Sequence, residues 1–350
     1  MKPHVRTLLS ALSTAFFVVF SCDGEAQQFQ KEELVFHSQT FKIVGDMTLP
    51  VGSGPFSVVL FVHGDGPNNR TSGVTYPPIM ERMLRAGYAT FSWDKPGTGA
   101  STGTIDRSRL REQRARIVLD AIDVVKRRPD IAADRIGLWG ISQAGYVMPQ
   151  VIAQSKDVAF MIAVSCPGEA GVEQGSYLFT AQAVCAGLPV EDAKRVEQLV
   201  SAASKAQTYE EYARNKAALS EYPVLENMSL LGFKIGVAPR DEWHADDPAS
   251  DYFWDPMEVI ETTAIPVIAF FGEKDTQADP IQGAEAYRAA LSRAGNPHSR
   301  VELIPGVDHN LIIAKTGCLE ERSKRSRSGW TKYAPEYLDT LEEWLVEIRR

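Results

Sequence analysis

A short segment near the middle of the chain, residues 135–145, constrains the fold more than any other. It begins as an apolar run, Arg135–Trp139, and continues as Gly140-Ile141-Ser142-Gln143-Ala144-Gly145, so small residues flank a serine on both sides. Small residues at these positions are typical of a strand that turns directly into a helix, where larger side chains have no room. Such a turn raises the serine hydroxyl above the sheet edge, beside the positive end of the helix dipole. Ser142 is therefore a candidate nucleophile.

Strand-like and helix-like stretches alternate along most of the chain. A hairpin is expected over residues 33–49, with its turn at Gly45-Asp46. Strands are expected at 56–62, 88–93, 135–139, 158–164, 266–271 and 300–303, and helices at 77–87, 108–128, 143–154, 281–293 and 330–348. This alternation predicts an α/β fold with a doubly wound, mostly parallel sheet that is covered on both faces.

Residues 169–260 interrupt this alternation. They are helical in pattern, rich in Ala, Glu, Gln and Lys, and contain no convincing strand. We therefore expect one core domain in two sequence pieces, residues 27–168 and 261–350, with a helical insertion, residues 169–260, between them.

The first 26 residues have the composition of a secretory signal. Lys2 and Arg6 precede a nearly uncharged run, 8–20, which is too short to span a bilayer permanently. Two cleavage sites compete. Val19-Phe20-Ser21-Cys22 resembles a bacterial lipobox, which would remove residues 1–21 and leave a lipid on Cys22, whereas Gly24-Glu25-Ala26 suits an ordinary signal peptidase. The sequence predicts an exported protein that is periplasmic, secreted or lipid-anchored at the bacterial cell envelope. The alternative is that the segment is never cut and serves as a membrane anchor.

Charge and cysteine content narrow the choice of partners. The formal net charge is −8, which argues against a nucleic-acid partner. The basic run at residues 322–327 is expected to be a solvated loop, with docking to an anionic surface as the weaker alternative. Of the four cysteines, Cys166 and Cys185 can pair in an oxidising compartment, leaving Cys318 over, and Cys166 is otherwise expected to be a small buried apolar residue. The cysteines do not have metal-binding spacing.

A serine hydroxyl becomes a good nucleophile when a base removes its proton and a third group orients that base. Among the six histidines, His309 directly follows the last expected strand, where a loop can reach back to Ser142. Asp275 follows the preceding strand and is the expected orienting carboxylate, with Asp279 as a rival in the same loop. Asp308 adjoins His309 in sequence, so their side chains are expected to point apart.

With Ser142, Asp275 and His309 in this order, the chain resembles the α/β-hydrolases, in particular the serine esterase and dienelactone-hydrolase-like group, over roughly residues 55–165 and 262–350. The chain has Ala144 where the usual elbow pattern has its last glycine. The resemblance implies an oxyanion hole formed by the backbone N–H groups of Gln143 and of Asp65, the latter in His63-Gly64-Asp65-Gly66. Because a carboxylate repels an oxyanion, the Asp65 side chain must point away or be paired. His63 is expected to be a structural hydrogen-bonding residue.

The resemblance also extends to two other parts of the chain. Residues 92–101 resemble the glycine-containing stretch that the family carries after its next strand, and the family commonly places a cap over the active site at the position of residues 169–260. The aromatic and aliphatic side chains of this insertion are expected to line an acyl pocket or to form its own core. His244 lies among acidic residues, and polar surface is a better interpretation of this segment than a metal site. The sequence contains no cofactor motif, and the predicted reaction needs none.

The leading interpretation is an exported serine hydrolase that cleaves small-molecule carboxylic esters through an acyl-enzyme. An aminopeptidase or oligopeptidase of the same fold and an acyltransferase are alternatives. An alternative of another class is a non-catalytic lipoprotein that binds a ligand. The natural ester and the oligomeric state are left open by the sequence.

Overall fold

The computed structural model describes residues 16–19, 28–226, 228–230, 233–247 and 250–349. Its main element is a nine-stranded sheet in the order β1-β2-β3-β5-β4-β6-β7-β10-β11. The three pairs at the β1 end are antiparallel, and the other five pairs, from β5–β4 to β10–β11, are parallel. The strands are β1 Phe16–Val19, β2 Gln28–Ser38, β3 Phe41–Leu49, β4 Phe56–Val62, β5 Ala89–Trp93, β6 Ile131–Ile141, β7 Val158–Val164, β10 Val267–Gly272 and β11 Arg300–Ile304.

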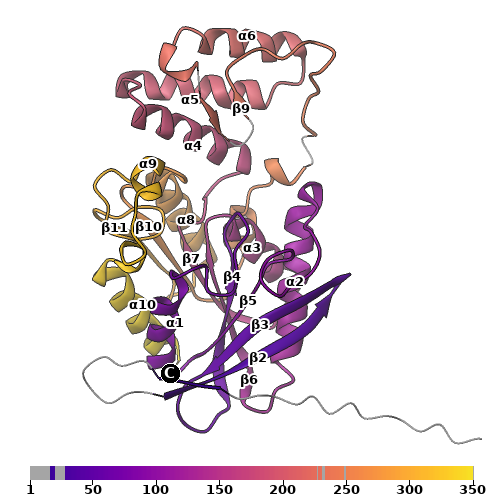
Figure 1. Ribbon diagram of the computed structural model, residues 1–350, viewed down its shortest axis with the longest axis vertical. Coiled ribbons are helices and arrows are strands. Elements are labelled where there is room, and N and C mark those ends of the chain that lie inside the picture. The colour runs from indigo at the N-terminus through magenta and orange to yellow at the C-terminus, as the bar shows by residue number, and fades with distance from the viewer. Residues whose placement is uncertain (1–15, 20–27, 227, 231–232, 248–249, 350) are drawn as a thin grey trace, which may run out of the picture.

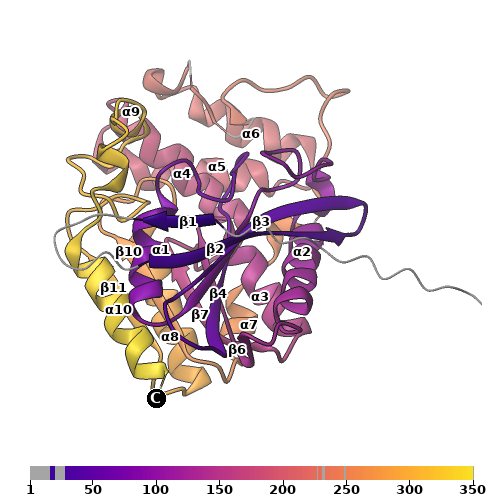
Figure 2. The same cartoon turned by 60° about the horizontal axis from the view of Figure 1, so that its bottom comes forward.

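Helices cover both faces of this sheet, as the alternation of elements predicts (Figure 2). One face packs against α1 (Tyr76–Arg85) and α10 (Pro335–Ile348). The other packs against α2 (Leu110–Val125), α3 (Ala144–Gln154), α7 (Met257–Ile260) and α8 (Pro280–Ala294). Successive residues of β4 alternate between the two cores, because side chains of a strand point to opposite faces. The predicted fold class, a doubly wound and mostly parallel α/β sheet, is therefore confirmed.

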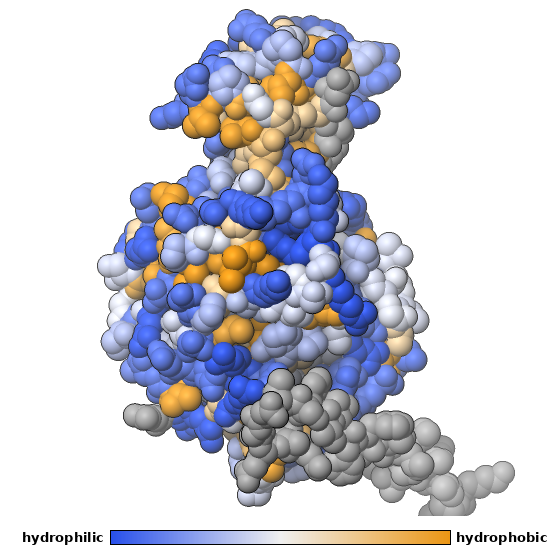
Figure 3. All heavy atoms as spheres, turned by 60° about the vertical axis from the view of Figure 1, so that its left-hand side comes forward, coloured by the Kyte–Doolittle hydropathy of each residue, from blue (hydrophilic) through white to orange (hydrophobic). Residues whose placement is uncertain are grey.

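A second group of helices follows the carboxyl end of β7 and lies above the sheet in Figure 1. It contains α4 (Gly171–Cys185), α5 (Val190–Ser204) and α6 (Tyr209–Leu219), followed by the two-residue strands β8 (Ser229–Leu230) and β9 (Phe233–Lys234). We call α4–α6 with β8 and β9 the helical unit. It has a small hydrophobic core of its own, and the molecule narrows between this unit and the sheet (Figure 3). The pair β8–β9 is a strand pair that the helical pattern does not predict.

The turn of the first hairpin is not where the sequence suggests. It lies at Gln39-Thr40, where Gln39 has a φ of 55°, and Gly45 and Asp46 lie inside β3. A Cβ on Gly45 would come within 2.6 Å of the carbonyl oxygen of Ser92 on β5. The glycine is therefore needed for close approach of two strands, a use that looks the same as a turn in the sequence.

The last helix begins at Pro335 and not at Trp330, which lies in a 3₁₀ turn at Gly329–Thr331. Proline is favoured at the first helical position because it lacks the N–H that would be unpaired there. A short helix, α9 (Leu319–Ser323), precedes this turn. Further 3₁₀ turns lie at Arg107–Arg109, Pro223–Leu225 and Asp251–Phe253.

The cysteine pairing differs from the one that the sequence allows. The disulfide joins Cys185 at the end of α4 to Cys318 just before α9, and Cys166 is free and buried. Cys166 therefore has the predicted role of a small buried residue, whereas the pairing of Cys166 with Cys185 is wrong. Cys166 packs against Gly145: a Cβ added to Gly145 would lie 2.7 Å from the Cβ of Cys166. The correct pair is 133 residues apart in sequence, so only the tertiary structure brings it together.

Most of the predicted signal segment, residues 1–26, lies outside the described residues. The exception is β1, which pairs antiparallel with β2. In the described part of the chain, none of the helices has the length and apolar character needed to cross a membrane.

Candidate active site

Ser142 lies between the end of β6 and the start of α3, on the tight turn that the sequence predicts. Its φ is 59°, in the left-handed region that side chains other than glycine rarely adopt. The turn is fixed by hydrogen bonds from Ser142 N to Val164 O, 2.9 Å, and from Gly145 N to Ser142 O, 2.8 Å. Strain of this kind persists only where the surrounding structure enforces it, and it is common at functional sites.

The small residues around Ser142 each have a packing reason. A Cβ on Gly140 would lie 2.6 Å from the Cβ of Ala144, and Gly145 packs against Cys166. Ala144 is fully buried between them. The glycine required for close contact with Cys166, two residues after the end of β7, is therefore Gly145, and the methyl group of Ala144 is accommodated one position earlier.

His309 and Asp275 come from two loops at the same edge of the sheet. His309 Nδ1 and Asp275 Oδ2 are 2.7 Å apart, and both side chains are buried. The other carboxylate oxygen of Asp275 accepts hydrogen bonds from the backbone N–H groups of Gln277, 2.7 Å, and Ala278, 3.1 Å. The carboxylate is therefore held in a fixed orientation toward the imidazole.

Two other aspartates near His309 have different partners. Asp279 caps α8 by accepting hydrogen bonds from the N–H groups of Ile281 and Gln282. Asp308 points away from the His309 ring: it accepts hydrogen bonds from the N–H groups of Asn310 and Ile312 and forms an ion pair with Arg325 at 2.8 Å. Of the aspartates that the sequence offers, the structure thus brings Asp275 to the imidazole.

Ser142 and His309 line the same pocket, a cavity of about 410 Å³. Among the described residues, the imidazole is hydrogen-bonded to Asp275 and not to the Ser142 hydroxyl. Such bonds often tighten only when substrate binds. The pocket is lined by Gly64, Asp65, Asn68, Ser72, Gly73, Val74, Thr75, Tyr76, Ile141, Ser142, Gln277, His309, Asn310, Arg322 and Trp330.

The loop with Gly64 and Asp65 lies directly against the serine. A Cβ on Gly64 would be 3.1 Å from the carbonyl oxygen of Ile141 and 3.4 Å from the Ser142 Cβ. The Asp65 carboxylate accepts a hydrogen bond of 3.2 Å from the Gln143 side-chain amide. The repulsion expected from Asp65 is thus reduced by pairing, and the two residues predicted as backbone donors are tied to each other.

Two cations that the sequence does not single out hold this loop. Arg114 of α2 is buried, and its guanidinium donates to the Gln143 side-chain oxygen at 2.5 Å and to the His63 carbonyl. Lys95 Nζ donates to the carbonyl oxygens of Gly64, 3.0 Å, and Gly66, 2.7 Å. Burial lowers the pKa of Arg114 to about 10, and burial with the nearby charge of Arg114 lowers the pKa of Lys95 to about 7.

Arg114 carries a sequence signal that can be recognised in retrospect. It precedes the buried residues Val118 and Ala121 by four and seven positions, so it lies on the apolar face of α2. A charged residue on a buried helix face needs a partner, which makes such a position a candidate for function.

His63 has the structural role expected of it. Its Nε2 bonds to the Trp93 carbonyl at 2.5 Å, its Nδ1 lies 2.9 Å from the Tyr76 hydroxyl, and burial lowers its pKa to about 3. The ring is therefore neutral, with Nε2–H donating and Nδ1 accepting.

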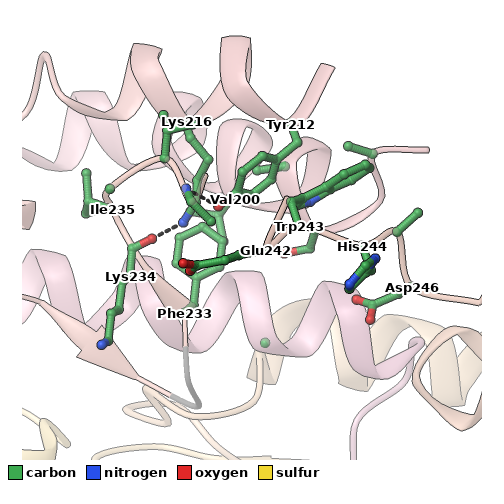
Figure 4. A pocket seen from close by; sticks show the side chains of 18 of the residues that line it. Val200, Tyr212, Lys216, Phe233, Lys234, Ile235, Glu242, Trp243, His244 and Asp246 are labelled. Carbon is green, nitrogen blue, oxygen red and sulfur yellow. Dashed lines mark hydrogen bonds between the residues drawn. The ribbon is translucent and has the colours of Figure 1, made fainter. Parts of the chain in front are cut away.

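A larger cavity of about 840 Å³ lies between the helical unit and the segment that follows β9 (Figure 4). It shares no lining residue with the Ser142 pocket. Its walls include the aromatic side chains of Tyr212, Phe233 and Trp243, whereas Phe179 and Leu225 form the core of the helical unit. The expected role in the insertion's own core is thus present, whereas none of the residues that line the Ser142 pocket comes from the insertion. His244 lines this cavity, and among the described residues no group of three or more His, Cys, Asp or Glu side chains is arranged to hold a metal ion.

The mostly parallel sheet and the serine on a strand–helix turn define an α/β-hydrolase fold. Solved structures support this class: an esterase of Pyrococcus furiosus, Pf2001, has a TM-score of 0.54 with 14% identity, over 91% of this chain and 90% of that one. The esterase Est1E of Butyrivibrio proteoclasticus has a TM-score of 0.51 with 14% identity, over 91% of this chain and 98% of that one.

Residues 32–307 match the X-Pro dipeptidyl-peptidase family, Peptidase S15, and the chain therefore belongs to that family. The matched range contains Ser142 and Asp275 and ends just before His309. A curated relative, the esterase EstD of Thermotoga maritima, is 23% identical over 303 residues, which are 82% of this chain and 61% of EstD. The chain thus spans about three fifths of the length of that relative.

Proposed function

We propose that this protein is an exported serine hydrolase that cleaves carboxylic esters through an acyl-enzyme on Ser142. The observation that carries the proposal is the 2.7 Å contact between His309 and Asp275 in the pocket that also contains Ser142 on its strained turn. The esterase relative, which has a related sequence, supports an ester as substrate.

In this mechanism the Ser142 hydroxyl oxygen attacks the ester carbonyl carbon while Nε2 of His309 takes its proton. Asp275, bonded to Nδ1, keeps the proton on that nitrogen and stabilises the imidazolium. The negative charge on the former carbonyl oxygen is met by the backbone N–H groups of Gln143 and Asp65. The ester C–O bond then breaks, and His309 returns the proton to the departing alcohol.

Hydrolysis of the acyl-enzyme repeats these steps with water. His309 takes a proton from the water, whose oxygen attacks the acyl carbon, and the proton passes to Ser142 as the acid leaves. Arg114 is a positioning residue in this scheme, because it holds the Gln143 side chain, next to Ser142, and the His63 carbonyl, at the start of the loop that contains Asp65.

Two features support the proposed location. The N-terminal sequence has the pattern of a secretory signal, and the Cys185–Cys318 disulfide belongs in an oxidising compartment. A lipid on Cys22 would tether the protein to the membrane.

The helical unit is proposed as a cap, since the Tyr177 hydroxyl and the Gln182 amide of α4 donate to the carbonyl oxygens of Asp275 and Thr276.

The test is a reaction of the mature protein, residue 27 onward, with a fluorophosphonate probe beside Ser142→Ala. Both are then assayed on p-nitrophenyl acetate and butyrate. We expect labelling and turnover in the wild type and neither in the variant. A folded wild-type protein without labelling would contradict the proposal and favour a binding module.

The family match favours one second candidate, a peptidase that releases X-Pro dipeptides. Alanyl-prolyl p-nitroanilide, compared with p-nitrophenyl butyrate under the same conditions, separates the two activities. A larger kcat/KM on the anilide would assign the protein to peptide cleavage. Labelling by the probe without turnover of either compound would point to an acyltransferase.

A further inference from the structure

One wall of the Ser142 pocket carries a cation that the proposed chemistry does not use. Arg322 of α9 lines this pocket together with Ser142, His309 and Trp330, and its side chain is 15% exposed. It belongs to the basic run 322–327, which the sequence presents as a solvated loop. The structure turns Arg322 and Arg325 inward, while Ser323, Lys324, Ser326 and Arg327 are exposed.

The guanidinium of Arg322 has donors left over. Its Nη2 donates to the Asn310 side-chain oxygen at 2.6 Å, whereas Nε and Nη1 are buried and have no hydrogen-bond partner among the described residues. An arginine has five N–H donors in a planar fork that suits a carboxylate. A buried charged donor without a partner costs free energy. A ligand that supplies hydrogen-bond acceptors here would remove this cost and therefore bind more tightly.

The surrounding charges do not neutralise both arginines. Asp308 is the carboxylate between them: Arg325 approaches its Oδ2 at 2.8 Å, and Arg322 Nε lies 3.9 Å from the same oxygen. The second oxygen of Asp308 is taken by backbone N–H groups. Both guanidinium groups also lie near the Trp330 ring, 5.5 Å from its centre for Arg322 and 4.9 Å for Arg325.

The other carboxylates near this pocket have partners of their own. The negative charge of Asp275 also favours the charged form of Arg322, but its two oxygens are bonded to His309 and to backbone N–H groups. Asp65 is bonded to Gln143 and lies near the cations Arg114 and Lys95. Among the described residues, the two guanidinium groups therefore have one carboxylate within ion-pair distance, that of Asp308. Arg322, the one that lines the pocket, is free to pair with an anion.

We propose that the preferred substrate is an ester that carries a second, free carboxylate, and that Arg322 binds this carboxylate while Trp330 forms the adjoining flat wall. The inference rests on the proposed ester hydrolysis at Ser142. The carboxylate lies either on the acyl side, as in a monoester of a dicarboxylic acid, or on the leaving alcohol. A cavity of about 410 Å³ is large enough for a small ester of either kind.

Two matched pairs of substrates test the proposal. The p-nitrophenyl monoester of succinic acid against p-nitrophenyl butyrate places the charge on the acyl side. The acetate ester of 4-hydroxybenzoic acid against the acetate of its methyl ester places the charge on the leaving group. We expect one charged member to have a kcat/KM about 10- to 100-fold above its neutral partner, the range typical of a hydrogen bond to a charged group.

Arg322→Gln should remove this preference, mainly through KM, and leave the neutral esters within about threefold of the wild type. Arg322→Lys, which keeps the charge but lacks the planar fork, should retain part of the preference. Arg327 is an exposed residue of the same run, and Arg327→Gln is the matched control. It should leave kcat/KM for both the charged and the neutral esters unchanged.

A structural role of Arg322, bracing Asn310 beside His309, predicts a different result. Arg322→Gln would then lower kcat for charged and neutral esters by the same factor, and this outcome would overturn the proposal, as would the absence of a preference in the wild type.

Binding to Ser142→Ala measured by calorimetry tests the site without turnover. The charged ester of the pair that the wild type prefers should bind at least about tenfold more tightly than its neutral partner, and the additional change Arg322→Gln should abolish the difference. Equal binding of the charged and neutral esters in both pairs would overturn the proposal. Failure of the proposed function is recognised separately, by a protein that the fluorophosphonate does not label.

Discussion

The two main cavities of this protein are assembled in different ways. The Ser142 pocket is lined by segments that lie between residues 64 and 330 of the sequence, brought together at the carboxyl edge of the sheet. The cavity of the helical unit is lined by residues between 175 and 252 alone. The first depends on the whole tertiary structure, whereas the second belongs to one continuous stretch of chain.

Buried charges follow the same division. Near Ser142, Asp275 and Arg114 bond to groups from other loops and other elements. In the helical unit, Lys216 is 3% exposed, its ammonium lies 3.5 Å from the centre of the Phe233 ring, and it donates to the Lys234 carbonyl (Figure 4). Within the described part of the chain it has no carboxylate at ion-pair distance. Near Ser142, buried charged groups thus link segments that are distant in sequence. In the described part of the helical unit, the buried charge of Lys216 has no opposite charge beside it and lowers the stability of the fold.

The largest effect is expected from Asp275→Asn in the first cavity. An asparagine there favours the wrong imidazole tautomer, and kcat for p-nitrophenyl butyrate should fall about 10⁴-fold with the fold intact. Asp279→Asn is the matched control, because asparagine also caps helices well, and its activity should stay close to the wild type. An equal loss in both variants would contradict the assignment of Asp275.

Arg114→Met should have the next largest effect, because it releases Gln143 and the His63 carbonyl from each other. If the oxyanion donors lose their position, kcat should fall about 10²- to 10³-fold with a smaller change in KM. The control is Arg116→Met on the same helix, where the arginine forms an exposed pair with Asp120. If Arg114→Met lowered thermal stability and left kcat unchanged, Arg114 would have a structural role and would not position the oxyanion donors.

The disulfide joins the two regions, since Cys185 ends α4 and Cys318 lies in the loop that follows His309. It closes a long loop, so replacing both cysteines by serine should lower the free energy of unfolding by about 2–4 kcal/mol. Urea titrations with and without reductant measure this. The double variant should be insensitive to reductant, and an unchanged wild-type midpoint under full reduction would contradict the expected contribution.

Lys216→Met should have the smallest effect and the opposite sign. Burial lowers the pKa of Lys216 from 10.5 to about 8, so the ammonium destabilises the folded state at pH values below about 8. The variant should be more stable at pH 7 by about 1 kcal/mol, since the charged group keeps part of its solvation.

The same pKa shift gives this prediction a pH window. The advantage of Lys216→Met should shrink from pH 8 to 10.5, because the unfolded lysine binds more protons than the folded one in that range. Arg214→Met on the exposed side of α6 is the control. A destabilised Lys216→Met at neutral pH would show that the contact with Phe233 outweighs the cost of burial.

Local sequence patterns predicted the fold well where the period of apolar residues and the small residues needed for close packing indicate the same element. The strand, turn and helix around Ser142 follow from the small residues there, each of which has a steric reason in the structure. Gly45 shows the limit of this reasoning, because a glycine that permits close strand packing looks the same in sequence as one that forms a turn. Its role depends on β5, a strand that comes more than 40 residues later.

The sequence by itself determined the order of the strands and helices of the sheet domain from residue 56 onward, the serine turn and the candidate residues Asp275 and His309, because each depends on a few neighbouring residues. Only the tertiary structure decided which aspartate meets the imidazole, which cysteines pair, that Arg114 bonds to Gln143 and the His63 carbonyl, and that Arg322 lines the pocket. The physical reason is distance along the chain: these contacts join segments that are adjacent only after the sheet has formed.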